Sequence, residues 1–394
     1  MTPVAPIASF NPRLQVVALV VGGVGLIVTV LLGLNNLDGF FRSYLMAEML
    51  WLGLALGCLG VVLVQFLTGG QWGFATRRIF EAGVGTVPLM AVLFVPILFG
   101  LPRLYAWAQP ADVAADVILQ HRAPYLNLPF VLGRSIVYLA VWVALALVLR
   151  RWSLIQDEND DLLILRRLQR FSVIGLIALG FTVSFAAIDW LMSLDADWYS
   201  TMYPPLVGTS FMLFALAFGI LMTTTLAGVT QLREVVTPRL FNDLGSLLLA
   251  FLMLWGYMEY FQYLLIWAGN LTDEIPWYLR RIEGGWLGVA LALGGIGFLV
   301  PFWFLLFRPL KRNPRTLRAI AALLIVMRLV DTYWLVKPPF EPGGPLVSWL
   351  DIAAVVGLGG VWLAVFLRQL TGRPLLVRYD PRFAPALEAA REAT

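Results

Sequence analysis

The sequence of 394 residues is poor in metal-binding side chains, because it contains one cysteine, Cys58, and one histidine, His121. A single cysteine excludes an intrachain disulfide and any cysteine-rich iron–sulfur or zinc site within the chain. A single histidine excludes haem held by two histidines of the same chain. We therefore expect this polypeptide to bind no redox cofactor of its own.

Charge is also scarce, since 13% of the residues are charged, 60% are hydrophobic and the mean hydropathy is +0.82. These values are far more apolar than those of a soluble domain of this length. Ten apolar runs are each long enough, at about 20 residues, to cross a bilayer as a helix. They cover approximately residues 14–34, 47–67, 86–107, 129–149, 170–192, 204–226, 244–268, 284–306, 318–336 and 346–370. We expect an all-α polytopic membrane protein, with residues 1–394 forming one integral membrane domain.

The connections between the runs carry unequal numbers of Lys and Arg. Twenty of the 28 basic residues fall on one side, six fall on the other, and two lie inside runs. By the positive-inside rule this bias places both termini in the cytoplasm. The first run lacks a cleavage site and is interpreted as a retained anchor. The net charge of +4 reflects this sidedness, so no nucleic-acid partner is expected.

Five charged residues lie inside apolar runs, namely Arg134, Asp189, Glu259, Arg328 and Asp331. Charges in hydrocarbon are costly, so ionisable residues there indicate a functional site by default. From their positions along the helices, all five are expected in the outer half of the membrane, meeting as one polar cluster. Arg328 and Asp331 are three residues apart and share a helix face. Arg134 is then expected to pair with Asp189 or Glu259.

Glu259 is the strongest candidate for proton transfer. It lies deepest, and residues 255–263 surround it with aromatic side chains, together with Gln262. The alternative interpretation is that the five charges neutralise one another and fix helix packing. Asp195, in an outer turn, is read as a solvated acid or the continuation of a proton exit. Residues 69–81 are read as a short interfacial helix.

Four segments resemble a known family. They read FAAIDWLMSLD at 185–195 with WYST at 198–201, WAGNL at 267–271 with EIPWY at 274–278, RLVD at 328–331, and YDPR at 379–382. In this order they resemble the NrfD-like (polysulfide reductase type) membrane subunits of bacterial alternative complex III, and are most similar to the ActF type.

The resemblance implies two four-helix bundles, made of runs two to five and six to nine, with runs one and ten peripheral. It also implies a subunit of a quinol:electron acceptor oxidoreductase of a respiratory or photosynthetic chain in the bacterial inner membrane. The implied partners are a paralogous NrfD-like membrane subunit, an iron–sulfur subunit and c-type cytochrome subunits. Iron–sulfur clusters and haem c would belong to those partners, and quinol or menaquinol would be the substrate.

The resemblance associates quinol oxidation with the paralogous subunit, and the ActF type with a proton route or a second quinone pocket. The candidate residues are therefore assigned to one or both of these two roles. The proton-route candidates are Glu259, Asp189, Asp331, Arg134, Arg328 and His121, and the quinone-contact candidates are His121, Tyr263 and Gln262. Two other functions stay open: a purely structural anchor for the iron–sulfur and cytochrome c subunits, and a secondary transporter.

Overall fold

The computed structural model describes residues 12–158, 162–227, 236–371 and 375–376. All secondary structure in these ranges is helical, which confirms the predicted all-α class. Nine of the described helices are long and apolar enough to cross a membrane, and a bent pair makes ten if it counts as one span. The YDPR segment at 379–382 lies outside the described residues.

The long helices follow the predicted runs closely. They are α1 (Pro12–Gly33), α2 (Leu37–Thr68), α8 (Leu128–Glu158), α9 (Leu162–Trp190), α10 (Tyr203–Leu226), α11 (Pro238–Gly269), α16 (Pro314–Val336) and α17 (Trp349–Leu370). The third span consists of α3 (Trp72–Val84), α4 (Val87–Leu93) and α5 (Val95–Leu104), and it bends by 52° before α5. The eighth consists of α13 (Trp286–Ala292), the π-helix η4 (Leu293–Leu299) and α14 (Val300–Leu306).

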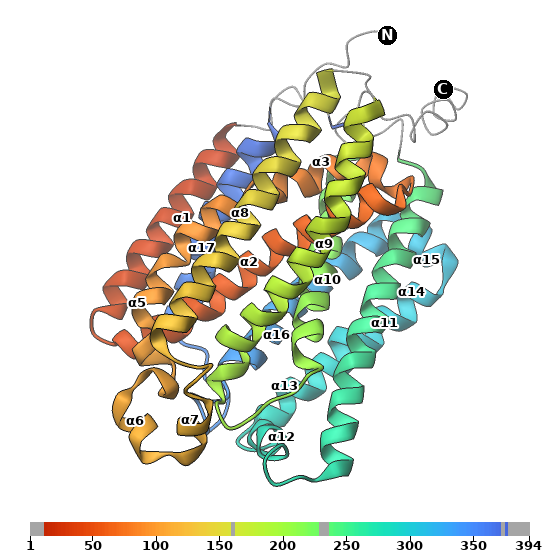
Figure 1. Cartoon of the computed structure of the whole chain (residues 1–394). Coiled ribbons are helices and arrows are strands. Elements are labelled where there is room, and N and C mark those ends of the chain that lie inside the picture. The colour runs from red at the N-terminus through yellow and green to blue at the C-terminus, as the bar shows by residue number, and fades with distance from the viewer. Residues whose placement is uncertain (1–11, 159–161, 228–235, 372–374, 377–394) are drawn as a thin grey trace.

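Short helices fill the connections. One end of the molecule holds η1 (Ala106–Ala108), α6 (Pro110–Ala115), α7 (Val117–Arg122), η2 (Met192–Leu194) and α12 (Pro276–Ile282), and is called the α12 end below (Figure 1). The opposite end holds α15 (Arg308–Arg312).

The spans pack as two groups of four. In the first group α2 packs on the third span and on α9, and α8 packs on α9; in the second, α10 packs on α11 and α16, and α11 packs on α14. The two groups meet where α10 packs on α2 and α9 (Figure 1). The peripheral position predicted for the first run is found for α1, but α17 is only partly peripheral. It packs on α2 and buries the rings of Trp362 and Phe366 completely.

Helices α1 and α17 touch through their backbones. A Cβ atom added to Gly22 would lie 2.4 Å from the amide nitrogen of Val361, and one added to Gly25 would lie 2.7 Å from Cα of Gly357. Inside a membrane there is no hydrophobic drive between helices, so such small-residue contacts provide the van der Waals packing that joins them. These glycines therefore allow α1 to pack directly against α17.

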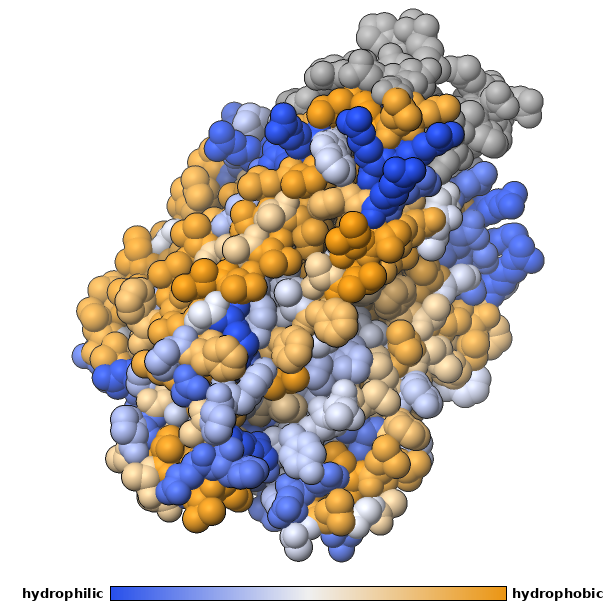
Figure 2. All heavy atoms as spheres, in the orientation of Figure 1, coloured by the Kyte–Doolittle hydropathy of each residue, from blue (hydrophilic) through white to orange (hydrophobic). Residues whose placement is uncertain are grey.

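The outer surface has the pattern of a protein immersed in lipid. Figure 2 shows an apolar region across the middle of the molecule, with most hydrophilic side chains toward its two ends. Valines and leucines of α1, such as Val16, Val20 and Leu31, are more than half exposed. Together with the long apolar helices, this surface supports a multi-pass membrane protein.

The short helix predicted within residues 69–81 is found, but it is buried in the protein; its interfacial depth stays a prediction. The segment forms a helix, α3, but its residues from Gly73 to Val84 are buried. Glu81 accepts hydrogen bonds from Arg77 Nε at 2.7 Å, from Arg78 Nη1 at 2.5 Å and from Ser153 Oγ at 2.6 Å. These contacts satisfy the buried carboxylate and fix α3 against α8 inside the bundle, where sequence hydropathy alone suggested a surface position.

Candidate functional site

Arg134 of α8 and Asp189 of α9 form a closed ion pair. Arg134 donates from Nε to Oδ2 and from Nη2 to Oδ1 of Asp189, each at 2.8 Å. The hydroxyl of Tyr138 donates to the same carboxylate at 2.9 Å, and the Asp189 side chain is fully buried. Of the two partners left open for Arg134, the structure selects Asp189. Because both carboxylate oxygens are occupied by protein donors, the pair serves as a brace between the two helices.

Arg328 and Asp331 form a second buried pair on α16. Arg328 Nη1 lies 3.0 Å from Asp331 Oδ2, and both side chains are less than 5% exposed. The Arg328 guanidinium also lies 4.5 Å from the ring centroid of Trp255 on α11, close enough for a cation–π contact. The local pairing predicted from their spacing is confirmed.

The five charges do not form the one cluster that was expected. Arg134 and Asp189 lie in the first bundle, whereas Glu259, Arg328 and Asp331 lie in the second. Among the described residues, no hydrogen bond or ion pair joins one group to the other. All five nevertheless lie toward the α12 end of their helices, as their sequence positions predicted.

Glu259 faces a cavity. In the described part of the chain its carboxyl makes no hydrogen bond or ion pair, and it lines a space of about 700 Å³ between α11, α12 and the eighth span. The charged groups that act on it electrostatically are Asp331, Arg328 and Arg281. An acid without a protein partner that faces a cavity is free to exchange a proton with whatever occupies that space.

The cavity has a buried end and an open end. At the buried end lie Arg281, Tyr278, Trp334 and Trp255, each at most 6% exposed. The open end is lined by side chains that are about half exposed or more on the membrane-facing surface. These are Tyr260, Leu287, Leu291 and Leu299.

Arg281 connects the cavity to the α12 surface. Its Nη1 lies 3.3 Å from Asp195 Oδ2, and Arg280 pairs with the other oxygen of the same carboxylate. Burial lowers the pKa of the Arg281 guanidinium, and the negative charge of Asp195 counteracts this. Asp195 is buried, so its reading as a solvated acid is wrong, while the Arg280 side chain is 38% exposed. The three residues form a polar connection from the cavity to the surface.

A chain of hydrogen bonds orients Tyr278. The Ser200 hydroxyl donates to Gln262 Oε1 at 2.9 Å, and Gln262 Nε2 donates to Tyr278 Oη at 3.2 Å. Burial and the nearby Glu259 raise the pKa of Tyr278 above its ordinary value, so the phenol keeps its proton at neutral pH. Since the phenol oxygen already accepts from Gln262, its O–H is available to donate to a molecule in the cavity.

The predicted quinone contacts do not form one site. Tyr263 lines the cavity beside Glu259, whereas Gln262 is buried behind Tyr278 and does not line it. His121 borders a different cavity of about 290 Å³, together with Arg122, Tyr125 and Trp198. Tyr263 and His121 therefore line different cavities.

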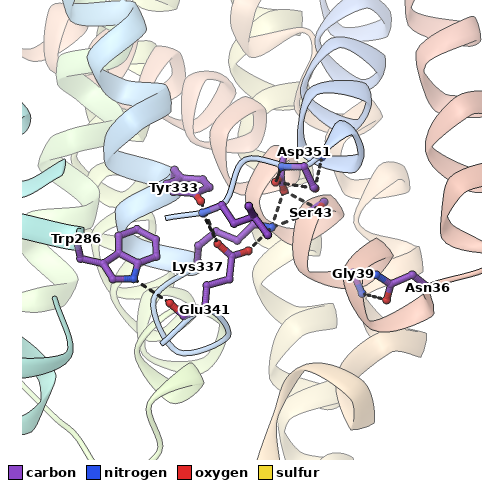
Figure 3. Close-up of polar contacts among 10 residues, drawn as sticks. Asn36, Gly39, Ser43, Trp286, Tyr333, Lys337, Glu341 and Asp351 are labelled. Atoms are coloured by element: carbon purple, nitrogen blue, oxygen red, sulfur yellow. Dashed lines mark hydrogen bonds and ion pairs between the residues drawn. The ribbon is translucent and has the colours of Figure 1, made fainter. Parts of the chain in front are cut away.

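Sequence reasoning missed a buried lysine cluster, shown in Figure 3. Lys337, which follows the last residue of α16, is 3% exposed and lies 2.6 Å from Asp351 of α17 and 3.4 Å from Glu341. Ser43 of α2 donates to Asp351 at 2.6 Å. Trp286 Nε1 donates to the backbone oxygen of Glu341 at 2.9 Å, which ties the start of α13 to the same cluster (Figure 3).

Glu48 was also missed. It is completely buried in α2, and neither carboxylate oxygen has a hydrogen-bond partner among the described residues. The predicted run began at residue 47, which put Glu48 at the membrane boundary. The observed helix begins at Leu37, so the residue lies well inside the protein.

Among the described residues, no group of three or more His, Cys, Asp or Glu side chains could hold a metal ion. A scan of the sequence against protein-family models finds no match, and a search of curated proteins also finds none.

Proposed function

We propose that this chain is a membrane subunit of a quinol:electron acceptor oxidoreductase of the alternative complex III type. It would contribute a quinone pocket and a proton route, while electrons pass through iron–sulfur clusters and haem c of partner subunits. The observation that carries the proposal is the cavity at Glu259, which is polar and ionisable at its buried end and apolar where it meets lipid. A quinol has the same polarity, with a hydroxylated aromatic head and an isoprenoid tail.

The buried end suits the head group of a quinol. Tyr278 can donate a hydrogen bond to one ring oxygen, and Glu259 can accept the proton of a hydroxyl group. Oxidation converts quinol to quinone with release of two electrons and two protons. In this proposal iron–sulfur clusters of a partner subunit would accept the two electrons one at a time, and Glu259 would accept one proton from the head group and release it before it accepts the second.

The protons then leave toward the α12 end, where Arg281, Asp195 and Arg280 form a charged connection to the surface. Because arginine keeps its proton and both Asp195 oxygens are paired, these residues set the electrostatic field of the exit, and water beside them carries the protons. In this orientation the α12 end faces the periplasm and both termini lie in the cytoplasm, as the excess of basic residues on the opposite side favours. The Arg328–Asp331 pair sets the field on Glu259, and the Arg134–Asp189 pair holds the first bundle together.

The segments that carry the resemblance support the proposal by their positions. Ser200 comes from the WYST segment and Tyr278 from the EIPWY segment, and a hydrogen-bond chain through Gln262 joins the two residues. Arg328 and Asp331 come from RLVD, and both act electrostatically on Glu259. Segments far apart in the sequence thus meet around one cavity.

The composition of the assembly is the first test. The tagged chain, extracted from its native membranes in mild detergent, should purify together with subunits that show c-type haem absorption and iron–sulfur signals. Recovery of an intact chain without any haem or iron–sulfur subunit would contradict the proposal.

The second test is Glu259→Gln in the purified complex, which preserves size and removes the proton acceptor. We expect quinol-driven acceptor reduction and proton release to fall by about 10²-fold, in the range typical for loss of a general base. Asp197→Asn, at an exposed position of the α12 end, is the matched control and should leave both rates unchanged. If Glu259→Gln keeps both rates, Glu259 is not the proton acceptor.

A further inference from the structure

The open side of the Glu259 cavity is built from an irregular helix. The eighth span widens from α13 into the π-helix η4 before it continues as α14. Pro301 lies one residue into α14 and has no backbone N–H, and its ring clashes with the carbonyl four residues earlier in an ordinary α-helix. The wider turn over Leu293–Leu299 avoids this clash, and π-turns of this kind often occur at functional sites.

Two glycines of the π-helix leave room in the cavity wall. Gly294 and Gly295 line the cavity, and a Cβ atom added to either would have no heavy atom within 4 Å. Any side chain at these positions would reach into space that is now open. The neighbouring wall residues Leu291 and Leu299 are 66% and 49% exposed, so this space continues to the membrane-facing surface.

We propose that the gap at Gly294 and Gly295 is the passage through which the isoprenoid tail of a quinol leaves the cavity and enters the lipid. The inference rests on the function proposed above. The head group lies at Glu259 and Tyr278, and the tail runs along the apolar wall of Phe298, Leu291 and Leu299. The site therefore selects quinols that carry an isoprenoid tail over tail-free quinols, because burial of the tail against this wall adds to binding.

The Lys337 cluster holds this wall in place. Trp286, the first residue of α13, is fully buried and donates to the backbone of Glu341, which pairs with Lys337. The start of the eighth span is thereby fixed to α16 and α17 (Figure 3).

The test uses Gly294→Leu in the purified complex, with Gly295→Leu as a second variant. Two photoreactive azidoquinones, one with an isoprenoid tail and one without, are cross-linked, and labelling of peptides within residues 255–299 is measured by mass spectrometry. The Cβ of either leucine meets no heavy atom within 4 Å, so the side chain extends into the open space of the passage. We expect the tailed probe to label either variant about tenfold less than wild type, and the tail-free probe to label both as before.

Gly288→Leu is the matched control, because Gly288 lies on the same span, also has no atom within 4 Å of an added Cβ, and does not line the cavity. It should keep wild-type labelling with both probes. Unchanged labelling of the glycine variants by the tailed probe, or equal loss of both probes, would overturn the passage and leave the proposed function standing. Absence of cavity labelling by either probe in wild type would overturn both.

Discussion

Two carboxylates near the α12 end show how differently charged residues are used in this protein. Asp189 is fully buried and accepts hydrogen bonds from Arg134 and Tyr138, so its charge is neutralised within the protein. Glu259 has no such partner among the described residues and faces a cavity. Breaking a buried pair leaves an uncompensated charge, so Asp189 serves structure. Glu259 is free to react with a ligand.

The orientation of Tyr278 leads to a prediction for binding. Tyr278→Phe keeps the ring and removes the O–H that is free to donate into the cavity. We expect the apparent affinity for quinol to fall by about tenfold, as for the loss of one hydrogen bond of roughly 1.4 kcal/mol. The measurement is the KM for quinol of the purified complex, with kcat recorded separately.

Tyr260→Phe is the control for this change. Tyr260 lines the same cavity, but its side chain is 64% exposed at the membrane-facing end. Its variant should keep the wild-type KM. Equal KM values for wild type and Tyr278→Phe would show that the phenol does not contact the substrate.

Some of the buried charged residues could be predicted from the sequence and others could not, for a physical reason. Glu259, Arg134 and Asp189 stand out because a charge inside an apolar run is rare and costly. Asp195, Arg281 and Lys337 lie at the edges of the runs, where a solvated charge is the ordinary case. Their burial depends on which helices meet there, and that is a tertiary property.

Single helices were predicted better than their irregularities. The runs of hydrophobic residues located the ten spans within a few residues at most ends, because span length is set by the bilayer. The 52° bend before α5 and the π-helix η4 depend on Pro96 and Pro301 together with the packing of neighbouring helices. Hydropathy does not contain that information.

We expect loss of the buried Lys337 charge to weaken the packing of α16 against α17 strongly. Lys337→Met removes the ammonium and, within the described part of the chain, leaves the buried Asp351 with Ser43 and the Ser348 capping contacts. We expect a loss of about 3–5 kcal/mol in the free energy of unfolding, measured by thermal and denaturant unfolding of the purified protein. The double variant with Asp351→Asn should recover part of this loss, because the unpaired charge is then gone.

The surface pair between Arg103 and Asp38 is the comparison for the buried cluster. Its side chains are 48% and 52% exposed. Arg103→Ala should therefore change the free energy of unfolding by only about 0–1 kcal/mol. A Lys337→Met effect of the same small size would show that the buried lysine has no structural importance.

The contact between α1 and α17 gives a prediction with a control on the adjacent residue. A Cβ atom added to Gly22 would lie 2.4 Å from the Val361 nitrogen, so the side chain in Gly22→Leu meets the backbone of α17. A Cβ atom added to Gly23 would have no heavy atom within 4 Å. We expect Gly22→Leu to lower the free energy of unfolding by an overpacking penalty of about 1–3 kcal/mol, and therefore to lower the thermal unfolding midpoint, and Gly23→Leu to leave both unchanged. Equal unfolding midpoints for the wild type, Gly22→Leu and Gly23→Leu would show that close packing at Gly22 does not hold α1 against α17.

At the scale of the whole molecule, two bundles joined along α2, α9 and α10 agree with the arrangement that the resemblance implied. The assignment of sides to the membrane is testable because the native Cys58 is completely buried and gives no background labelling. Cysteine replacing Asp197, at the α12 end, should react with an impermeant maleimide on intact cells stripped of their outer membrane. Cysteine replacing Arg312 of α15 should react only after permeabilisation.

The reverse pattern would place the α12 end in the cytoplasm. It would contradict both the orientation and the direction of proton release proposed above. Labelling of both positions in intact cells would show that the membrane barrier was lost, and a second impermeant reagent would then be applied to the same two variants.

Asp195 is shared between two arginines, and this has a consequence for the complete assembly. One arginine borders the cavity, and the other reaches the exterior, where a neighbouring protein can touch it. If an acidic group of a neighbouring protein docked on Arg280, it would compete with Asp195 and leave that carboxylate to pair with Arg281 alone. Any effect of such docking on the affinity for a ligand in the cavity would be reciprocal, so the ligand would change the docking affinity by the same factor.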